Sequence, residues 1–191
     1  MKNSSGPIAA TVLRVMSQQE KFWNEPESAD LHDLLRYSFF LGFFPFAGYL
    51  FSYTIRGTIW SYWPFIQTTL GVGSGLVFAS LQWILFSTFP VVSALMLEFL
   101  TSRSKYRLEF NSCALLVTYS FTPLCLSTLF VGIPYVDRIA TTFGFATFLY
   151  LLYYGFRYFL HFTIARSTVF AALLLILFVF FRELFVFAIG Y

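Results

Sequence analysis

The stretch Leu115–Phe162 decides the fold of this chain, and three motifs mark it: Tyr119-Ser-Phe-Thr-Pro123, Gly132-Ile-Pro134-Tyr135 and Tyr150-Leu-Leu-Tyr-Tyr-Gly155. Long apolar runs flank the middle motif, so the stretch predicts two membrane-spanning helices joined by a tight turn. Tyr119 and Pro123 are four residues apart, which places them on one face of the first helix. A proline inside a helix removes a backbone hydrogen bond and bends the helix, and at membrane depth neighbouring helices must satisfy the freed carbonyl group. We therefore expect this hairpin to pack inside a helical bundle.

Composition places the rest of the chain in the same class. Of its 191 residues, 58% are hydrophobic and 11% are charged, whereas about a quarter of the residues in a soluble domain are charged. Five apolar segments are long enough to cross the hydrocarbon core, which takes about 20 helical residues. They fall at about residues 34–53, 71–97, 112–131, 139–160 and 168–189. The sequence thus predicts an all-α polytopic membrane bundle with five transmembrane helices.

The distribution of basic residues predicts the orientation of these spans. Most lysines and arginines lie on the N-terminal side of the membrane, within residues 1–36, 103–107 and 157–166. Because cytoplasmic loops carry such an excess, the N-terminus is expected in the cytoplasm and the C-terminus across the membrane. The net charge of +3 is small and scattered, which argues against nucleic acid as a partner.

Residues 1–33 are expected to form a cytoplasmic N-terminal segment, followed by a five-span membrane domain over residues 34–191. Apolar residues recur in this segment at helical spacing and predict an amphipathic helix: Val12, Val15, Met16, Phe22 and Trp23. Two placements fit the pattern equally well. The helix lies in the membrane interface with Phe22 and Trp23 among the headgroups, or it packs on the bundle itself.

Gly71, Gly75 and Ala79 recur every four residues at the start of the second span. Such a ladder of small residues lets another helix backbone approach closely in lipid, where no hydrophobic force drives helices together. We expect these three residues to form a packing surface. They are not a dinucleotide-binding motif, because an apolar helix follows and no strand precedes them.

Arg182 and Glu183 are the ionisable residues at membrane depth. A charge in hydrocarbon costs at least about 2.5 kcal/mol, so such residues are functional candidates by default. Adjacent helical residues point about 100° apart, which makes them a poor pair for each other. We expect each to contact another helix or another membrane protein; a proton or ion path is the less favoured alternative.

No set of residues indicates catalysis. The sequence contains no nucleophile–base–acid arrangement and no phosphate-binding loop. His32 and His161 lie at span ends, and no carboxylate or cysteine cluster with metal-ligand spacing is evident beside either. The interpretation is a protein that is not an enzyme and that needs no metal or cofactor.

The hairpin resembles the Yip-domain family, the five-span membrane proteins related to the Ypt/Rab-interacting proteins of the secretory pathway. The resemblance rests on Tyr119 with Pro123, Ile133-Pro134 in the turn, and Tyr150–Gly155. Phe22-Trp23-Asn24-Glu25-Pro26 also looks like the short segment that precedes the first span in prokaryotic members. The resemblance implies that Tyr119, Pro123, Pro134 and Gly155 shape the bundle and are not catalytic. Eukaryotic relatives carry a long cytosolic region before the first span, so the short segment here favours a bacterial-type member.

These observations lead to one functional hypothesis and two alternatives. The hypothesis is a scaffold or accessory subunit that binds other integral membrane proteins, within a larger membrane complex and in contact with lipids. The alternatives are a small transporter or channel, and a membrane-trafficking or membrane-shaping factor. The expected location is the bacterial inner membrane, with the Golgi or endoplasmic reticulum membrane as the alternative.

Overall fold

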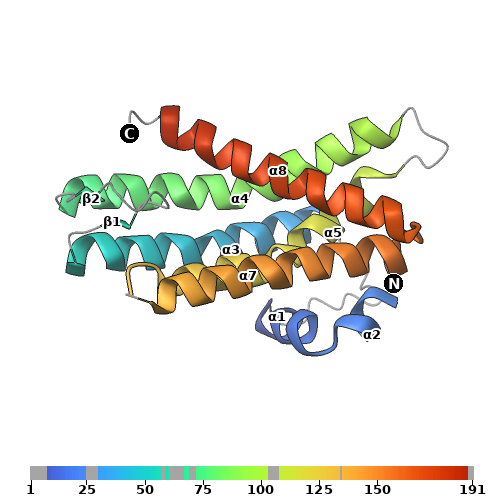
Figure 1. Cartoon of the computed structure of the whole chain (residues 1–191), viewed down its shortest axis with the longest axis horizontal. Coiled ribbons are helices and arrows are strands. Elements are labelled where there is room, and N and C mark those ends of the chain that lie inside the picture. The colour runs from blue at the N-terminus through green and yellow to red at the C-terminus, as the bar shows by residue number, and fades with distance from the viewer. Residues whose placement is uncertain are drawn as a thin grey trace.

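A bundle of long helices dominates the computed structural model (Figure 1). The structure describes residues 8–24, 30–56, 59–60, 67–68, 72–102, 108–133 and 135–188. The α-helices are α1 (Ile8–Ser17), α2 (Gln19–Asn24), α3 (Leu31–Phe51), α4 (Val72–Ser102), α5 (Phe110–Ser120), α6 (Thr122–Ser127), α7 (Val136–Tyr154) and α8 (Ile164–Ala188). Shorter elements are the π-helices η1 (Ser52–Arg56) and η3 (Gly155–Phe159), the 3-10 helix η2 (Thr128–Phe130), and the antiparallel pair β1 (Ile59–Trp60) and β2 (Gln67–Thr68).

Five helical segments in the described part of the chain are long and apolar enough to cross a membrane. They are Leu31–Thr54, Gly73–Ser102, Phe110–Phe130, Val136–Phe159 and Ile164–Leu184. The prediction of an all-α bundle with five transmembrane helices is therefore confirmed. The cytoplasmic N-terminus and the division of the chain at residue 34 remain predictions.

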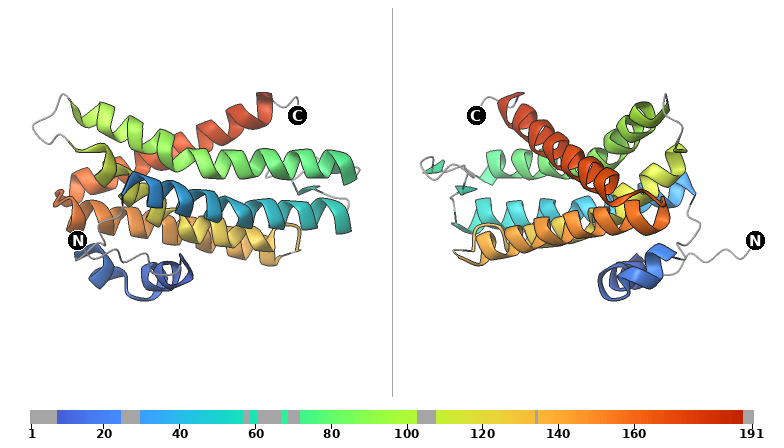
Figure 2. Two further views of the ribbon diagram at one scale, coloured as in Figure 1. Left: turned by 180° about the vertical axis from the view of Figure 1, so that it is seen from behind. Right: turned by 45° about the vertical axis from the view of Figure 1, so that its right-hand side comes forward.

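Three spans contain a proline, and α3 continues past Pro45 as one helix. α4 continues past Pro90 as one helix, and Figures 1 and 2 show it bending along its length. The third span is instead divided, because α5 ends at Ser120 and α6 begins at Thr122, with Pro123 in its first turn. Proline fits the first turn of a helix, where its missing N–H would have no helical partner.

Phe121 lies at this interruption and forms the centre of the core. Its side chain is fully buried. The centre of its ring lies 5.0 Å from that of Phe89 and 5.5 Å from that of Phe86, both on α4. It also lies 5.6 Å from Phe148 on α7 and 5.5 Å from Phe178 on α8. The ring of Phe121 therefore connects the third span with three other spans. Of the apolar window of the third span, 83% is buried.

The two N-terminal helices lie against one flank of the bundle, on the side of α7 (Figures 1 and 2). Phe22 and Trp23 are fully buried. The ring of Phe22 lies 5.0 Å from Tyr119, and that of Trp23 lies 6.1 Å from Phe159. Both rings therefore pack on the bundle, and the position of the helix relative to the membrane interface stays a prediction.

Glycines allow close helix contacts at several places in the fold, and Gly48 and Gly75 are two of them. A Cβ atom on Gly48 of α3 would collide with the backbone carbonyl oxygen of Thr128. A Cβ atom on Gly75 of α4 would lie 2.7 Å from Cβ of Tyr53. Gly75 and Ala79 of the small-residue ladder are both buried, whereas Gly71 lies outside the described residues.

We predict that Gly48→Ala destabilises the protein by about 1–3 kcal/mol, the usual cost of overpacking, because a backbone atom cannot move aside as a side chain can. The measurement is the free energy of unfolding in detergent micelles. Gly73→Ala is the control, since a Cβ atom there meets nothing within 4 Å. Equal stability of the two variants would contradict the close approach of α3 to η2.

Candidate functional site

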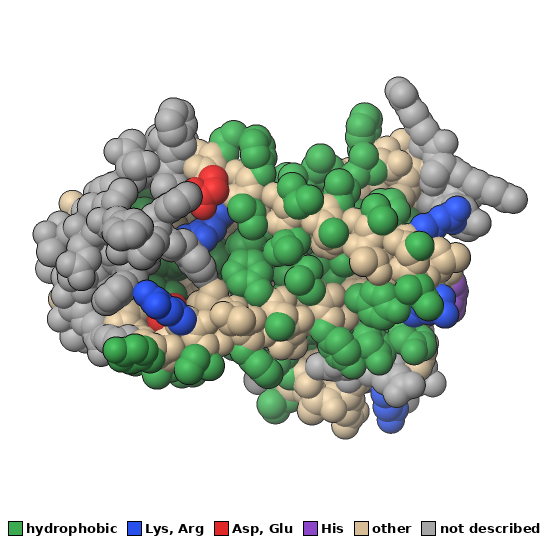
Figure 3. Space-filling model, in the orientation of Figure 1, with side chains coloured by type: hydrophobic (Ala, Val, Ile, Leu, Met, Phe, Trp, Pro, Cys, Tyr) green, Lys and Arg blue, Asp and Glu red, His purple; other side chains and the backbone are tan. Residues whose placement is uncertain are grey.

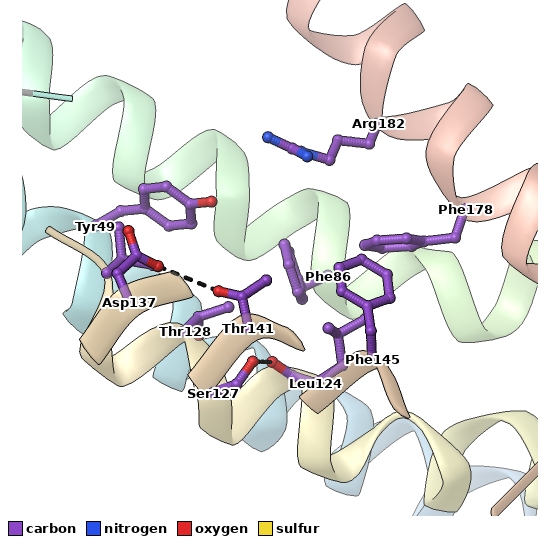
Figure 4. Close-up of a pocket in the computed structure, with 11 residues that line it drawn as sticks. Tyr49, Phe86, Leu124, Ser127, Thr128, Asp137, Thr141, Phe145, Phe178 and Arg182 are labelled. Carbon is purple, nitrogen blue, oxygen red and sulfur yellow. Dashed lines mark hydrogen bonds between the residues drawn. The ribbon is translucent and has the colours of Figure 1, made fainter. Parts of the chain in front are cut away.

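A small polar pocket lies between α3, α4, α7, α8 and the segment from α6 to Val131 (Figure 4). Its volume of about 30 Å³ is enough for roughly one water molecule. Polar and apolar side chains line it: Tyr49, Phe86, Leu124, Ser127, Thr128, Val131, Asp137, Thr141, Phe145, Phe178 and Arg182. The pocket thus places polar groups from several elements within the membrane-spanning part of the bundle.

Asp137 in the first turn of α7 organises one side of this pocket. Its carboxylate accepts a hydrogen bond from the Oγ1 hydroxyl of Thr141 at 3.1 Å and one from the backbone N–H of Gly132 at 3.3 Å. Gly132 has a φ of +80°, a conformation that favours glycine. A carboxylate near a helix N-terminus is also stabilised by the helix dipole. Asp137 therefore ties the turn between η2 and α7 to the start of α7.

Arg182 enters the pocket from α8. Figure 4 shows its side chain extending from α8 toward Tyr49, above Thr141. It is half-buried and has an interaction within its own chain. One turn earlier, Phe178 packs 4.9 Å from Phe89 and 5.6 Å from Phe145, measured between ring centres. Together, these two side chains fix the face that α8 turns toward the bundle.

Glu183 points elsewhere, because successive helical residues are about 100° apart. Its side chain is exposed. Within the described residues, its carboxylate makes no hydrogen bond or ion pair. The structure therefore separates the two ionisable residues of α8, with Arg182 in the pocket and Glu183 on the outer surface. Their role as partner contacts stays a prediction.

The other predicted residues lie away from this pocket. Tyr119 is buried between Phe22 and Tyr37. Gly155 faces Leu116 and Trp23, and a Cβ atom there would collide with Leu116. Pro134 lies outside the described residues.

Pro123 lines a second, apolar groove of about 340 Å³ on the flank of the bundle. α1, α6 and α7 contribute most of its lining: Met16, Pro123, Leu126, Ser127, Phe130, Val136, Ile139, Ala140, Phe143 and Gly144. The groove has almost no polar surface, and its residues belong mostly to the spans. Lipid chains suit such a surface.

A correction concerns the start of α3. The sequence interpretation found no metal-ligand cluster beside His32, but ligand atoms of Asp30, His32 and Asp33 lie within 4.8 Å of one another. All three are exposed, and Asp30 is the N-cap, since its carboxylate accepts the backbone N–H of Asp33 at 2.8 Å. Capping explains why Asp30 stands at the start of this helix.

Sequence reasoning missed most of the polar pocket. Asp137 falls in the predicted turn between the spans at 112–131 and 139–160, and Tyr49 and Thr141 fall within predicted spans. Asp137 and Thr141 are four residues apart, a spacing that favours contact on a helix. Nothing in the sequence connects either residue with Tyr49 or Arg182, which lie on other helices.

Comparison with known proteins gives one match. The sequence model described as the Yip1 domain matches residues 13–182, which include the first four spans in full and most of the fifth, Ile164–Leu184. No curated protein and no solved structure matches the chain. The match extends the resemblance seen in the hairpin to nearly the whole sequence, and it does not distinguish bacterial-type members from others.

We predict that Thr141→Val destabilises the protein by about 1–2 kcal/mol, because a hydrogen bond to an ionised carboxylate is lost at constant side-chain shape. The free energy of unfolding in micelles measures the effect. Thr142→Val is the matched control, since Thr142 is the exposed neighbour of the same shape and such surface changes usually stay within about 0.5 kcal/mol. If both variants lost equal stability, the Asp137–Thr141 bond would not hold the pocket together.

Proposed function

The chain belongs to the Yip1 domain family, and from this we propose that it is a non-catalytic scaffold or accessory subunit that binds other integral membrane proteins. It is an integral membrane protein with five apolar helices. The match to the family supports a role inside the membrane. Its proposed location is the bacterial inner membrane, with the Golgi or endoplasmic reticulum membrane as the alternative.

One observation carries the proposal: α8 presents an ionisable residue, Glu183, on a side that the bundle leaves uncovered. Only 22% of the apolar window of α8 is buried, against 83% for the third span. α8 crosses the bundle at its periphery (Figures 1 and 2). A peripheral helix with an exposed carboxylate is suited to contact another protein, because polar residues in a membrane helix normally face protein or water.

The rest of the surface agrees with a membrane location. In Figure 3, hydrophobic side chains cover the middle of the visible face, and the charged side chains gather toward its two ends. Exposed isoleucines occur on more than one span, including Ile84 on α4 and Ile176 on α8, with 52% and 67% of their surfaces exposed. These residues offer equivalent chemistry on different faces, which allows the proposed binding face to be tested.

We predict that gentle purification at native expression retains other membrane proteins, and that α8 contacts them. A photo-crosslinking residue at Ile176 should yield a covalent adduct with a protein, whereas the same residue at Ile84 should yield mainly lipid adducts. Mass spectrometry of the adducts identifies the partner. Isolation of a lone monomer, with no protein adduct at Ile176, would refute the proposal.

A further inference from the structure

The outward face of α8 has the spacing of a helix–helix seam. Five of its exposed residues recur alternately three and four residues apart: Val169, Ala172, Ile176, Val179 and Glu183. This is the a/d spacing at which two helices pack along their length with a crossing angle of about 20°. The opposite face has Ala171, Leu174 and Phe178, which are buried in the bundle. The seam therefore points directly away from the rest of the protein.

The side chains of the seam also suit close packing of a second helix. Apart from Glu183, its residues are β-branched or small, and Ala172 leaves room for a larger side chain. Small and branched residues let helices in lipid approach and interlock. Val169 and Ile176 are 65% and 67% exposed, so nothing in the described chain fills the positions between them.

Glu183 ends this seam at membrane depth. It follows Arg166 by 17 residues, or about 25 Å of helix, within a hydrocarbon core of about 30 Å. A glutamate side chain is short, so it reaches the headgroups less readily than lysine or arginine does. An ionised carboxylate here is costly unless another group pairs with it.

We propose that Glu183 pairs with an arginine or lysine on a transmembrane helix of a different protein, which packs along the seam of α8. A cation at the level of Glu183 removes the cost of the isolated carboxylate and fixes the depth at which the partner binds, as a single polar position fixes register in a coiled coil. This inference rests on the proposed function, because it specifies the chemistry of the partner at the same helix.

A second copy of this chain fits the seam less well. Symmetric packing of α8 on α8 brings two Glu183 carboxylates together, and like charges repel. At this end of the bundle, the cations whose side chains the structure describes are Arg138 and Arg182. Both already have interactions within their own chain, and Arg182 lines the pocket. The cation is therefore expected from another protein.

Model helices test this chemistry directly. The full-length protein is reconstituted in phosphatidylcholine liposomes with fluorescent peptides of about 20 leucine and alanine residues, long enough to span the bilayer. One peptide has a single arginine near one end of the apolar stretch, and the others have glutamine or leucine at that position. Energy transfer from a label on α8 measures binding. We expect the arginine peptide to bind at least about tenfold more tightly than the leucine peptide.

Two variants show whether Glu183 causes this preference. Glu183→Gln should abolish it while leaving the binding of the leucine peptide unchanged. The double variant Glu183→Leu with Leu184→Glu keeps the composition but turns the carboxylate about 100° from the seam, and it should also lose the preference. Both residues are exposed, so the variants should fold, and a single symmetrical peak in gel filtration checks this.

The possible outcomes separate this inference from the proposed function. No preference for the arginine peptide, or a preference that survives Glu183→Gln, overturns the pairing even if Ile176 crosslinks to a partner. A crosslink from Ile176 to a second copy of the chain also overturns it. If no membrane protein copurifies or crosslinks, the proposed function fails, whatever the peptides show.

Discussion

The packing around Phe121 is the interaction on which the rest of the structure depends. Its ring contacts four others, Phe86, Phe89, Phe148 and Phe178. The ring lies where α5 gives way to α6, so the interruption ahead of Pro123 and the aromatic core occupy the same point. Beside it, the hydroxyl groups of Tyr37 and Thr122 form a hydrogen bond of 2.9 Å, which adds α3. In lipid, such packing and polar contacts replace the hydrophobic force that assembles soluble cores.

α8 is attached to this core by one face, and that attachment determines what its other face does. Phe178 contacts the central rings, and Arg182 reaches into the polar pocket one turn later (Figure 4). These contacts set the rotation of the helix about its axis. Glu183 is adjacent to Arg182, so its outward direction follows from the inward direction of its neighbour. By helping to set the rotation of α8, the polar pocket also determines which side chains α8 exposes on the surface.

Sequence reasoning located the spans well and the polar site poorly, for different physical reasons. A span is defined by the length of one apolar run, which is local information, and all five were found. α4 nevertheless continues to Ser102, beyond the expected end at residue 97, because a helix can continue after the apolar run that defines a span has ended. The pocket joins Tyr49, Asp137 and Arg182 from three helices, and only their arrangement in space brings them together. The N-terminal helix shows a third case, because its amphipathic pattern fits equally a membrane surface and the flank of a bundle.

The contrast between Arg182 and Glu183 explains how one helix can serve both stability and recognition. A long arginine side chain can stay hydrated or reach a polar pocket, so it is tolerated inside the bundle. The carboxylate of Glu183 on the outward side of α8 reaches no such pocket, and a cation brought by another molecule would lower its unfavourable energy. Apolar contacts along Val169, Ala172 and Ile176 would suit many helices about equally. The charge is what discriminates among them, because a helix without a matching cation leaves the carboxylate unpaired.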